Sequence, residues 1–482
     1  MTDLLRKAYD PESFRKSAHA LVDILADHIT DCQNGNNHMV LPWKEPVSHY
    51  REWNEFLADD NYSDKAFWGK VVDQSIHIHD PKYMGHQVSA PAMVSGLGDM
   101  INGLLNNGSA IYEMGPASNS MERVVIRWLA GAIGFGDQSE GFLTSGGSLG
   151  NLTALLAARQ NNSGFNVWKE GHKTGYKPAV IVSREAHYSI ARSVQILGWG
   201  EDAVIPAPVD DNLALDPAFL NSLMEKASAG GRQVIAVVGN ACTTSTGTYD
   251  PLDKIADFCQ ENGLWFHVDG AHGGAAAISP QYKHLTKGIT RADSVVIDFH
   301  KMMGISALAT AILFSNPEPS YANFDQEASY ILERNGGYEW FNSAKRTVEC
   351  TKNMMAVKPF AVLKLYGPRF FVDYLETCYD NGRLFARIID GHEDFELAVQ
   401  PQSNIVCFRY LREGKDDSWL NKVNSFVRMK IMEEGRFYIV QTSIKGKTYL
   451  RTSLMNPFTG EKEMKGLLSH ISELINTYHE DN

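Results

Sequence analysis

Residues of reactive types follow apolar segments in the middle of the chain. His300 and Lys301 come directly after the apolar run at 294–299, and Asp269 lies near the end of the run at 265–270. A carboxylate at the end of an apolar strand costs free energy unless a partner satisfies it. A lysine just past a buried strand is expected to be desolvated, which lowers its pKa and makes its amine nucleophilic. These positions predict a site with a reactive amine and an anion.

Two further apolar runs end in the same way. His187 follows the run at 179–183, and Thr244 follows the run at 234–239. Ligands of open α/β sheets bind beyond the carboxyl ends of the strands. We therefore expect these four strand ends to contribute to one site.

A Gly/Ser-rich turn joins a strand-like start to a helical pattern in GFLTSGGSLGNLTALLAAR, residues 141–159. Gly147 and Ser148 stand where the turn meets the helix. Small residues let the backbone approach an anion, and a helix start offers unpaired N–H groups. The segment lacks the G-x-G-x-x-G spacing of dinucleotide sites and the G-K-[ST] of nucleotide P-loops. It predicts a phosphate cradle of another kind.

A phosphate cradle, an amine, a carboxylate and an imidazole together fit pyridoxal 5′-phosphate. Its aldehyde bonds to a lysine, its pyridine nitrogen needs an anionic partner to stay protonated, and its phosphate needs a cradle. Taken singly, Lys301 could be a surface lysine, Asp269 a buried hydrogen-bonded carboxylate, and His187 a structural residue. Ser148 could cap the helix as well as bind phosphate. The combination favours the cofactor.

The elements that must position these residues form an α/β pattern. Near-continuous apolar runs are typical of strands buried on both faces of a mostly parallel sheet, and they occur at 179–183, 234–239, 265–270, 294–299 and 309–314. The last two are close together, so an antiparallel strand is expected at one edge. Helical periodicity covers the start of the chain, and helices and strands alternate near its end. We predict a helical segment at 1–75 whose apolar stripe packs against the rest of the chain or a partner subunit, a large α/β domain at 76–362, and a small α+β domain at 363–482.

Composition restricts the class of protein. The chain has 482 residues and a net charge of −12, so it lacks the basic surface of a nucleic-acid binder. It has no stretch of about 18 apolar residues, and we expect neither a membrane span nor a signal peptide. Six scattered cysteines without a C-x-x-C pair indicate reduced thiols in a cytoplasmic protein. His77, His79 and His86 have no cysteine or acidic cluster of clear spacing beside them, so no metal site is expected.

Six segments resemble the group II pyridoxal-phosphate amino-acid decarboxylases, which include glutamate, cysteine-sulfinate, aromatic amino-acid and 2,4-diaminobutyrate decarboxylases. They stand in the family's order: TSGGSLGNLTALLAAR, EAHYSIARSVQILG, ACTTSTGTYDPLDKIADF, WFHVDGAHGGAAAIS, KGITRADSVVIDFHKMM and YLRTSLMNPFT. The resemblance covers almost the whole chain. It implies an α/β, aspartate-aminotransferase-like fold (fold type I) with a mostly parallel sheet. It also implies a homodimer with the active site at the subunit interface.

The resemblance implies catalytic roles for individual residues. Lys301 resembles the family's Schiff-base lysine, and Asp269 resembles the carboxylate that pairs with the pyridine nitrogen. His187 resembles the imidazole stacked on one ring face, and Ala271 the small residue on the other. Tyr338 lies in a segment that resembles the family's mobile loop, and it is the candidate for protonating the product carbon.

The same resemblance implies binding roles for further positions. Matching positions imply phosphate or other cofactor contacts for Gly147, Ser148, Thr244 and His300. They imply contacts with the amino-acid substrate for His86, Gln87 and Arg451.

Two departures from the family pattern concern the substrate. Gly270 and His272 replace an alanine and an aromatic residue of the family's HVDAAW, and DFHK at 298–301 replaces NPHK. The second variant is associated with the diaminobutyrate-type branch. The expected reaction is decarboxylation of an L-amino acid to an amine and carbon dioxide. A diaminobutyrate-like or related short polar substrate is favoured, while acidic and aromatic amino acids stay open.

Other activities remain as alternatives. The same cofactor supports transamination and decarboxylation-dependent oxidative deamination. A non-catalytic binding or scaffold protein on the same fold is the alternative from a different class, and the intact Lys301, Asp269 and His187 argue against it.

Overall fold

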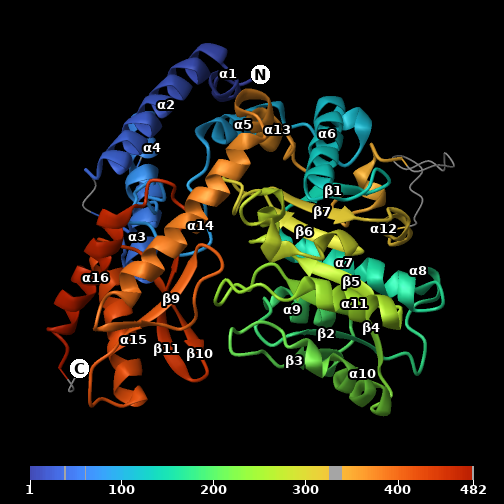
Figure 1. Ribbon diagram of the computed structural model, residues 1–482. Coiled ribbons are helices and arrows are strands. Elements are labelled where there is room, and N and C mark those ends of the chain that lie inside the picture. Colours follow the sequence, from blue (N-terminus) through green and yellow to red (C-terminus); the bar gives the residue numbers. More distant parts are fainter. Residues whose placement is uncertain (37–38, 60, 325–338, 480–482) are drawn as a thin grey trace. The chain divides into compact units, whose positions relative to one another are not determined.

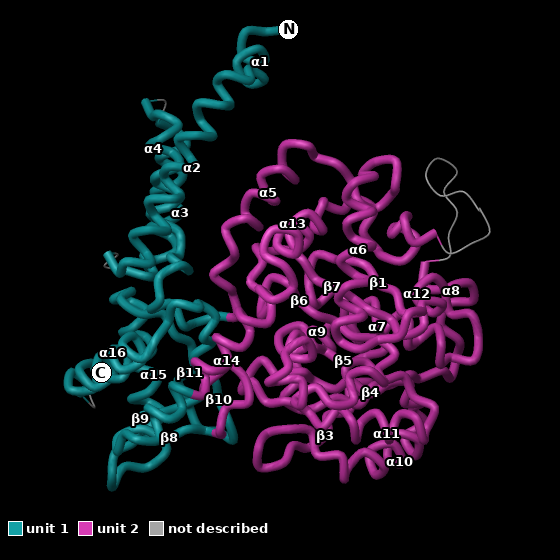
Figure 2. Tube along the Cα trace, turned by 45° about the horizontal axis from the view of Figure 1, so that its top comes forward, with its two compact units in different colours: residues 1–86, 384–398, 407–482 teal, residues 87–383, 399–406 magenta. Residues whose placement is uncertain are grey.

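A computed structural model describes residues 1–36, 39–59, 61–324 and 339–479 (Figure 1). These residues form two compact units (Figure 2). The first unit contains residues 1–86, 384–398 and 407–482, and the second contains residues 87–383 and 399–406. The division into three parts at 1–75, 76–362 and 363–482 stays a prediction.

The second unit is built on a seven-stranded sheet in the order β1-β7-β6-β5-β4-β2-β3. The strands are β1 (Glu140–Thr144), β2 (Pro178–Ser183), β3 (Val204–Ala207), β4 (Gln233–Asn240), β5 (Trp265–Asp269), β6 (Ser294–Asp298) and β7 (Thr310–Phe314). Neighbours from β3 to β6 are parallel, whereas β7 is antiparallel to both β6 and β1. The predicted mostly parallel α/β sheet is therefore confirmed.

Two details of the sheet differ from the expectation. The antiparallel strand β7 is not at the edge, because β1 pairs with its outer side. β3 was not predicted, since its four residues, VIPA, include a proline and form too short an apolar run. Both details depend on strand pairing, which the apolar pattern does not specify.

Helices cover both faces of this sheet (Figure 1). α7 (Gly147–Asn162) packs on the face that includes Val296 of β6, and a Cβ placed at Gly150 would lie 2.8 Å from Val296 Cγ2. α11 (Leu252–Asn262) packs on the other face, where a Cβ at Gly239 would lie 2.7 Å from Leu252 Cδ2. These two glycines allow helix and sheet to approach closely. The remaining helices of the unit are α5 (Met93–Leu105), α6 (Pro116–Ala132), α8 (Val167–Glu170), α9 (Ser189–Ile196), α10 (Leu220–Ala229), α12 (Glu318–Ala322), α13 (Val357–Tyr366) and the first part of α14 (Arg369–Asp390).

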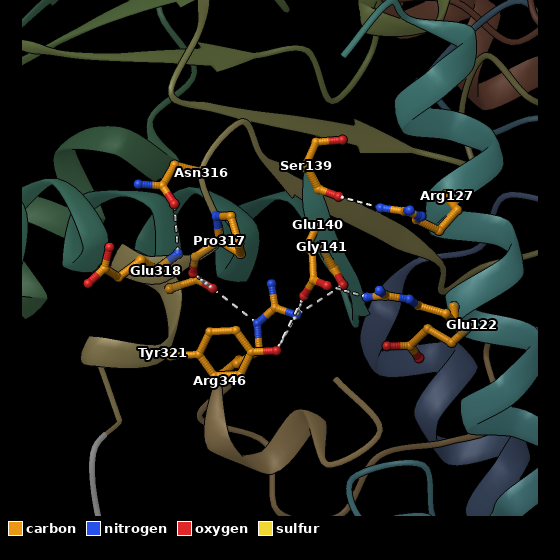
Figure 3. A network of polar contacts seen from close by, with 12 residues as sticks. Glu122, Arg127, Ser139, Glu140, Gly141, Asn316, Pro317, Glu318, Tyr321 and Arg346 are labelled. Carbon is orange, nitrogen blue, oxygen red and sulfur yellow. Dashed lines mark hydrogen bonds and ion pairs between the residues drawn. The ribbon is translucent and has the colours of Figure 1, made fainter. Parts of the chain in front are cut away.

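A buried arginine attaches the chain after residue 339 to strand β1 (Figure 3). Arg346 is 1% exposed; its Nε donates to Ser320 Oγ at 3.0 Å, and one terminal nitrogen lies 3.2 Å from Glu140 Oε2. Arg123 pairs with the other oxygen of Glu140 at 2.6 Å. This network fixes the start of β1, the strand whose other end leads into the Gly/Ser-rich turn.

The first unit combines the beginning and the end of the chain. Its helices are α1 (Asp3–Ala8), α2 (Pro11–Asn34), α3 (Pro46–Ala58), α4 (Asp64–Asp73), the last part of α14, α15 (Asp417–Glu434) and α16 (Glu461–Ile475). A four-stranded sheet has the order β10-β11-β9-β8, with β8 (Phe395–Leu397), most of β9 (Ile405–Tyr410), β10 (Val440–Ile444) and β11 (Lys447–Ser453). The helical pattern predicted at the start of the chain and the α+β pattern predicted near its end are both present.

The six cysteines all lie among the described residues and form no disulfide; five are buried and Cys350 is exposed. Among the described residues, none of the helices combines the length and the apolar character that a membrane crossing needs.

Candidate active site

A pocket of about 370 Å³ lies within the second unit, at the carboxyl ends of β2, β4, β5 and β6. Every residue predicted to bind the cofactor lines it: Gly147, Ser148, His187, Thr244, Asp269, Ala271, His300 and Lys301. Polar residues not singled out beforehand also line it, among them Asn151, Ser189, Asn240 and Asp298. The size is in the range of small-ligand sites. The structure therefore brings these residues together, while their roles toward a cofactor stay predictions.

The Gly/Ser-rich turn forms one wall of the pocket. The N-cap of α7 is Gly146, which has no side chain to cap the helix, so the first N–H groups are available to an anion. A Cβ at Gly147 would lie 3.1 Å from Ala271 Cβ and 3.3 Å from Asp298 Oδ1. Glycine at this position thus keeps space open at the helix start.

Asp269 ends β5 and is 6% exposed. Its Oδ2 accepts a hydrogen bond from Asn151 Nδ2 at 2.9 Å, and its Oδ1 accepts one from the Ala271 backbone N–H at 3.3 Å. Hydrogen bonds from neutral donors stabilise a carboxylate that has been removed from water. This geometry holds an anion at the pocket wall.

His267 lies two residues before Asp269, on the same face of β5, and is fully buried. Its Nε2 donates to Asn151 Oδ1 at 2.9 Å, and its Nδ1 accepts from Ser294 Oγ at 2.9 Å. Burial lowers the pKa of His267 to about 4, so the ring is neutral at pH 7. A neutral ring has one donor and one acceptor, which matches the two bonds.

The Asn151 carboxamide extends this network to His187. Asn151 Nδ2 also donates to Ser189 Oγ at 3.0 Å, and Ser189 Oγ lies 2.8 Å from His187 Nδ1. The Ser189 backbone N–H donates to the same Nδ1 at 3.3 Å. Nδ1 of His187 is therefore an acceptor, and the ring carries its hydrogen on Nε2. Burial lowers the pKa of His187, which favours this neutral form.

Sequence reasoning missed Asn151, Ser189 and His267 as parts of the site. A signal was available for Asn151, which lies four residues after Gly147 and therefore on the same side of the helix. His267 alternates with Asp269 along a strand, which also places the two side chains on one face.

Lys301 is paired with a second carboxylate of the pocket. Its Nζ lies 2.9 Å from Asp298 Oδ2, and Asp298 is 1% exposed. Burial, the largest single effect, would lower the pKa of Lys301, but the charge of Asp298 and its hydrogen bond to Nζ, together with the charges of Asp269 and Cys242, raise that pKa above its ordinary value. The expectation that desolvation makes this amine neutral is thus wrong, because the buried lysine has an adjacent counter-ion.

The remaining predicted site residues are His86, Gln87, Arg451 and Tyr338. Gln87 belongs to the second unit but does not line the pocket. His86 and Arg451 belong to the first unit, so their predicted contact with substrate stays a prediction. Tyr338 lies outside the described residues. Within the described parts of the chain, no group of three or more His, Cys, Asp or Glu side chains is placed to hold a metal ion.

Comparison with known proteins identifies the family. The model of the pyridoxal-dependent decarboxylase conserved domain matches residues 68–411. The chain belongs to the pyridoxal-dependent decarboxylase family. The predictions of family, fold class, cofactor and type of reaction are confirmed: the chain is a pyridoxal-phosphate-dependent carboxy-lyase that acts on an amino acid.

Relatives within this family have different stated activities. The chain is 27% identical to an L-2,4-diaminobutyrate decarboxylase of Acinetobacter baumannii, over 83% of this chain and 81% of that protein. It is 29% identical to an L-aspartate decarboxylase of Metarhizium robertsii, over 80% of this chain and 78% of that protein. A crystal structure of the glutamate decarboxylase domain of a diaminobutyrate-pyruvate transaminase and L-2,4-diaminobutyrate decarboxylase from Vibrio parahaemolyticus superposes with a TM-score of 0.84. It is 25% identical and covers 99% of this chain and 98% of that one.

The pocket fits this cofactor. The open helix start at Gly147 suits a phosphate, the hydrogen-bonded carboxylate of Asp269 suits a protonated pyridine nitrogen, and Lys301 supplies an amine for the aldehyde. All three groups come from the same pocket of one unit.

Proposed function

We propose that this decarboxylase acts on a short-chain polar L-amino acid of the 2,4-diaminobutyrate type and that Lys301 is the residue that bonds to the cofactor. The observation that carries the assignment of Lys301 is that it shares one pocket with Asp269, His187 and the open helix start. The substrate class is supported by DFHK at 298–301 and by relatives whose stated substrates are diaminobutyrate and aspartate.

The proposal also gives a role to each of the other residues predicted to bind the cofactor. When bound, the cofactor supplies an electron sink for the electron pair that departing carbon dioxide leaves behind. Asp269 holds the proton on the pyridine nitrogen, and the N–H groups at Gly147 and Ser148 bind the phosphate together with His300. Ala271 and His187 contact the two ring faces, and Thr244 is a further cofactor contact.

Proton delivery to the product carbon falls to His187, which carries a hydrogen on Nε2, or to Tyr338. His86, Gln87 and Arg451 are proposed to contact the substrate. An arginine suits a substrate carboxylate, because its planar guanidinium donates two parallel hydrogen bonds.

We also propose that the enzyme is a cytoplasmic homodimer with its active site at the subunit interface. One face of α5 exposes a row of apolar side chains at helical spacing, each between 46% and 59% exposed: Met93, Leu97, Ile101, Leu104 and Leu105. An apolar stripe of this extent on a helix is typical of a face that a partner covers. A second copy of this chain is the proposed partner.

Lys301→Ala tests the assignment of the lysine. We expect carbon dioxide release to fall on the order of 10³-fold or more, and the visible absorbance of the bound cofactor to disappear. Lys287→Ala is the matched control, because that lysine is 78% exposed and pairs with Asp253 at the surface. Near-normal turnover by Lys301→Ala would refute the assignment.

A screen of carbon dioxide release tests the substrate. The purified enzyme is offered 2,4-diaminobutyrate, ornithine, aspartate, glutamate, cysteine sulfinate and the aromatic amino acids. We expect the largest kcat/KM for 2,4-diaminobutyrate and an amine as the product. A preference for an aromatic amino acid contradicts the proposed substrate class, and an aldehyde or keto acid as the main product contradicts simple decarboxylation.

A further inference from the structure

Asp298 is the most deeply buried carboxylate of the pocket and ends strand β6, three residues before Lys301. Its Oδ1 accepts a hydrogen bond from Thr310 Oγ1 at 2.6 Å. Its Oδ2 lies 2.9 Å from Lys301 Nζ and 3.5 Å from His300 Nε2. A buried carboxylate that loses its cationic partner is strongly destabilised, so the carboxylate and the lysine depend on each other.

The two acids of the pocket have different partners. Asp269 receives hydrogen bonds from Asn151 and from the Ala271 backbone, whereas Asp298 is in contact with Lys301. The titratable groups whose charges act on Lys301 or lie beside it are Asp298, Asp269, Cys242, His187 and His300. Of these, Asp298 is the acid in direct ion-pair contact with the amine.

We propose that Asp298 is a positioning residue that holds Lys301 as an ammonium ion whenever this lysine is not bonded to the cofactor. The inference rests on the proposed role of Lys301. The NPHK pattern that DFHK replaces has asparagine at this position, and an amide carries no charge with which to hold an ammonium. In the DFHK variant of this chain, Asp298 supplies that charge.

The ion pair controls how readily the lysine reacts. To form a carbon–nitrogen double bond with an aldehyde, the ammonium must first lose one proton; the neutral amine then adds, and one water molecule leaves. That proton leaves to solvent, to which the 22% exposed side chain of Lys301 has access. The direction of the pKa of Lys301, above its ordinary value, agrees with this arrangement.

Asp298→Asn tests the proposal on the full-length chain without cofactor. Acetic anhydride acylates neutral amines, and mass spectrometry of the Lys301 peptide follows its rate between pH 6 and 11; the side chain is 22% exposed and within reach. The midpoint is the pH at which the acylation rate of Lys301 reaches half its maximum. We expect this midpoint to lie above that of an ordinary lysine in the wild type and below that of an ordinary lysine in Asp298→Asn. A fall of one pKa unit raises the neutral fraction about tenfold, so acylation at pH 8 should accelerate about tenfold or more.

Three controls make the result interpretable. Asp293→Asn removes a half-buried carboxylate just before the start of β6, at the end opposite Asp298, and should leave the Lys301 midpoint unchanged. Asp298→Glu keeps the charge and should label more like the wild type. Lys352, whose side chain is 0% exposed and pairs with Glu122 at 2.7 Å, reports unfolding if its peptide becomes labelled.

The proposal is overturned if Asp298→Asn keeps the wild-type midpoint while Lys352 stays protected. It is also overturned, without any variant, if wild-type Lys301 titrates at or below an ordinary lysine. A second measurement follows the rate at which added pyridoxal phosphate produces visible absorbance, and its pH dependence should move to lower pH in Asp298→Asn. If this absorbance is absent from the wild type and from every variant, the proposed bond between Lys301 and the cofactor is contradicted. The acylation experiment would still show whether Asp298 keeps Lys301 protonated.

Discussion

A continuous series of hydrogen bonds holds several side chains of the site, and each bond is donated in the same direction along the series. His267 donates to Asn151, which donates to both Asp269 and Ser189, and Ser189 donates to His187. The donor and acceptor directions along this series fit a neutral His267 and an Asp269 that accepts at both of its oxygens. The His187 imidazole and the Asp269 carboxylate are therefore oriented by the same carboxamide.

His267 makes the stability of the protein depend on pH. Its pKa is about 4 in the folded protein against an ordinary value of 6.5, so between these values the unfolded chain binds more protons and stability falls as the pH falls. We expect the His267 contribution to decrease by about 2 kcal/mol between pH 7 and pH 5. Urea unfolding at both pH values measures it.

The variant His267→Gln isolates this contribution. It should lower the free energy of unfolding at pH 7, because the buried bond from Ser294 is disturbed, and it should also reduce the loss between pH 7 and pH 5 relative to the wild type. His284→Gln, at an exposed histidine, should keep the wild-type pH dependence. An unchanged pH dependence in His267→Gln would show that this ring is not responsible.

The secondary elements place the Gly/Ser-rich turn, the proposed phosphate site, through one close contact. Gly150 of α7 faces Val296 of β6, and the turn at Gly147 lies one helical turn before it. Any residue that pushes the helix from the sheet displaces the first N–H groups of α7 as well. Packing and cofactor binding are thus linked at the start of this helix.

Gly150→Ala tests the link. The added Cβ would lie 2.8 Å from Val296 Cγ2, and overpacking of this kind costs about 1–3 kcal/mol. We expect a lower free energy of unfolding and faster loss of pyridoxal phosphate, measured by urea unfolding and by the decay of visible absorbance after dilution.

Gly131→Ala is the matched control for that variant. Gly131 lies in helix α6 with no heavy atom within 4 Å of an added Cβ, so the change should be neutral or stabilise by up to about 1 kcal/mol. If Gly150→Ala and Gly131→Ala change the free energy of unfolding and the rate of cofactor loss equally, the close contact between helix and sheet does not contribute to either.

At the scale of the whole molecule, the apolar row on α5 predicts self-association. Ile101→Glu introduces a charge into the middle of that row, where it would have to be buried without a partner. We expect the wild type to scatter light as a dimer of 53.6 kDa chains and the variant to shift to the mass of one chain, with loss of activity. Phe219→Glu, at a residue 43% exposed outside α5, should remain dimeric. A dimeric Ile101→Glu would place the interface elsewhere.

Much of the fold could be predicted from local pattern. The runs that became β2, β4, β5, β6 and β7 are apolar throughout, because central strands of a covered sheet are buried on both faces. The position of β1 outside β7 could not be predicted in this way, since it depends on hydrogen bonds between segments about 170 residues apart in sequence.

The residues of the site likewise divide into those that local sequence pattern predicted and those that it did not. Lys301, Asp269, His187 and Gly147 were predicted because strand ends and helix starts have recognisable sequences. Asn151 and His267 were missed, because the signal for each was its spacing from Gly147 or Asp269 and not its residue type.

The sequence by itself determined the cofactor, the type of reaction and the family, because those depend on residue types held in a constant order along the chain. Only the tertiary structure decided which acid contacts Lys301 and therefore in which direction the pKa of its amine is shifted. Charge depends on distances of a few ångströms between side chains, and such distances exist only after the chain has folded.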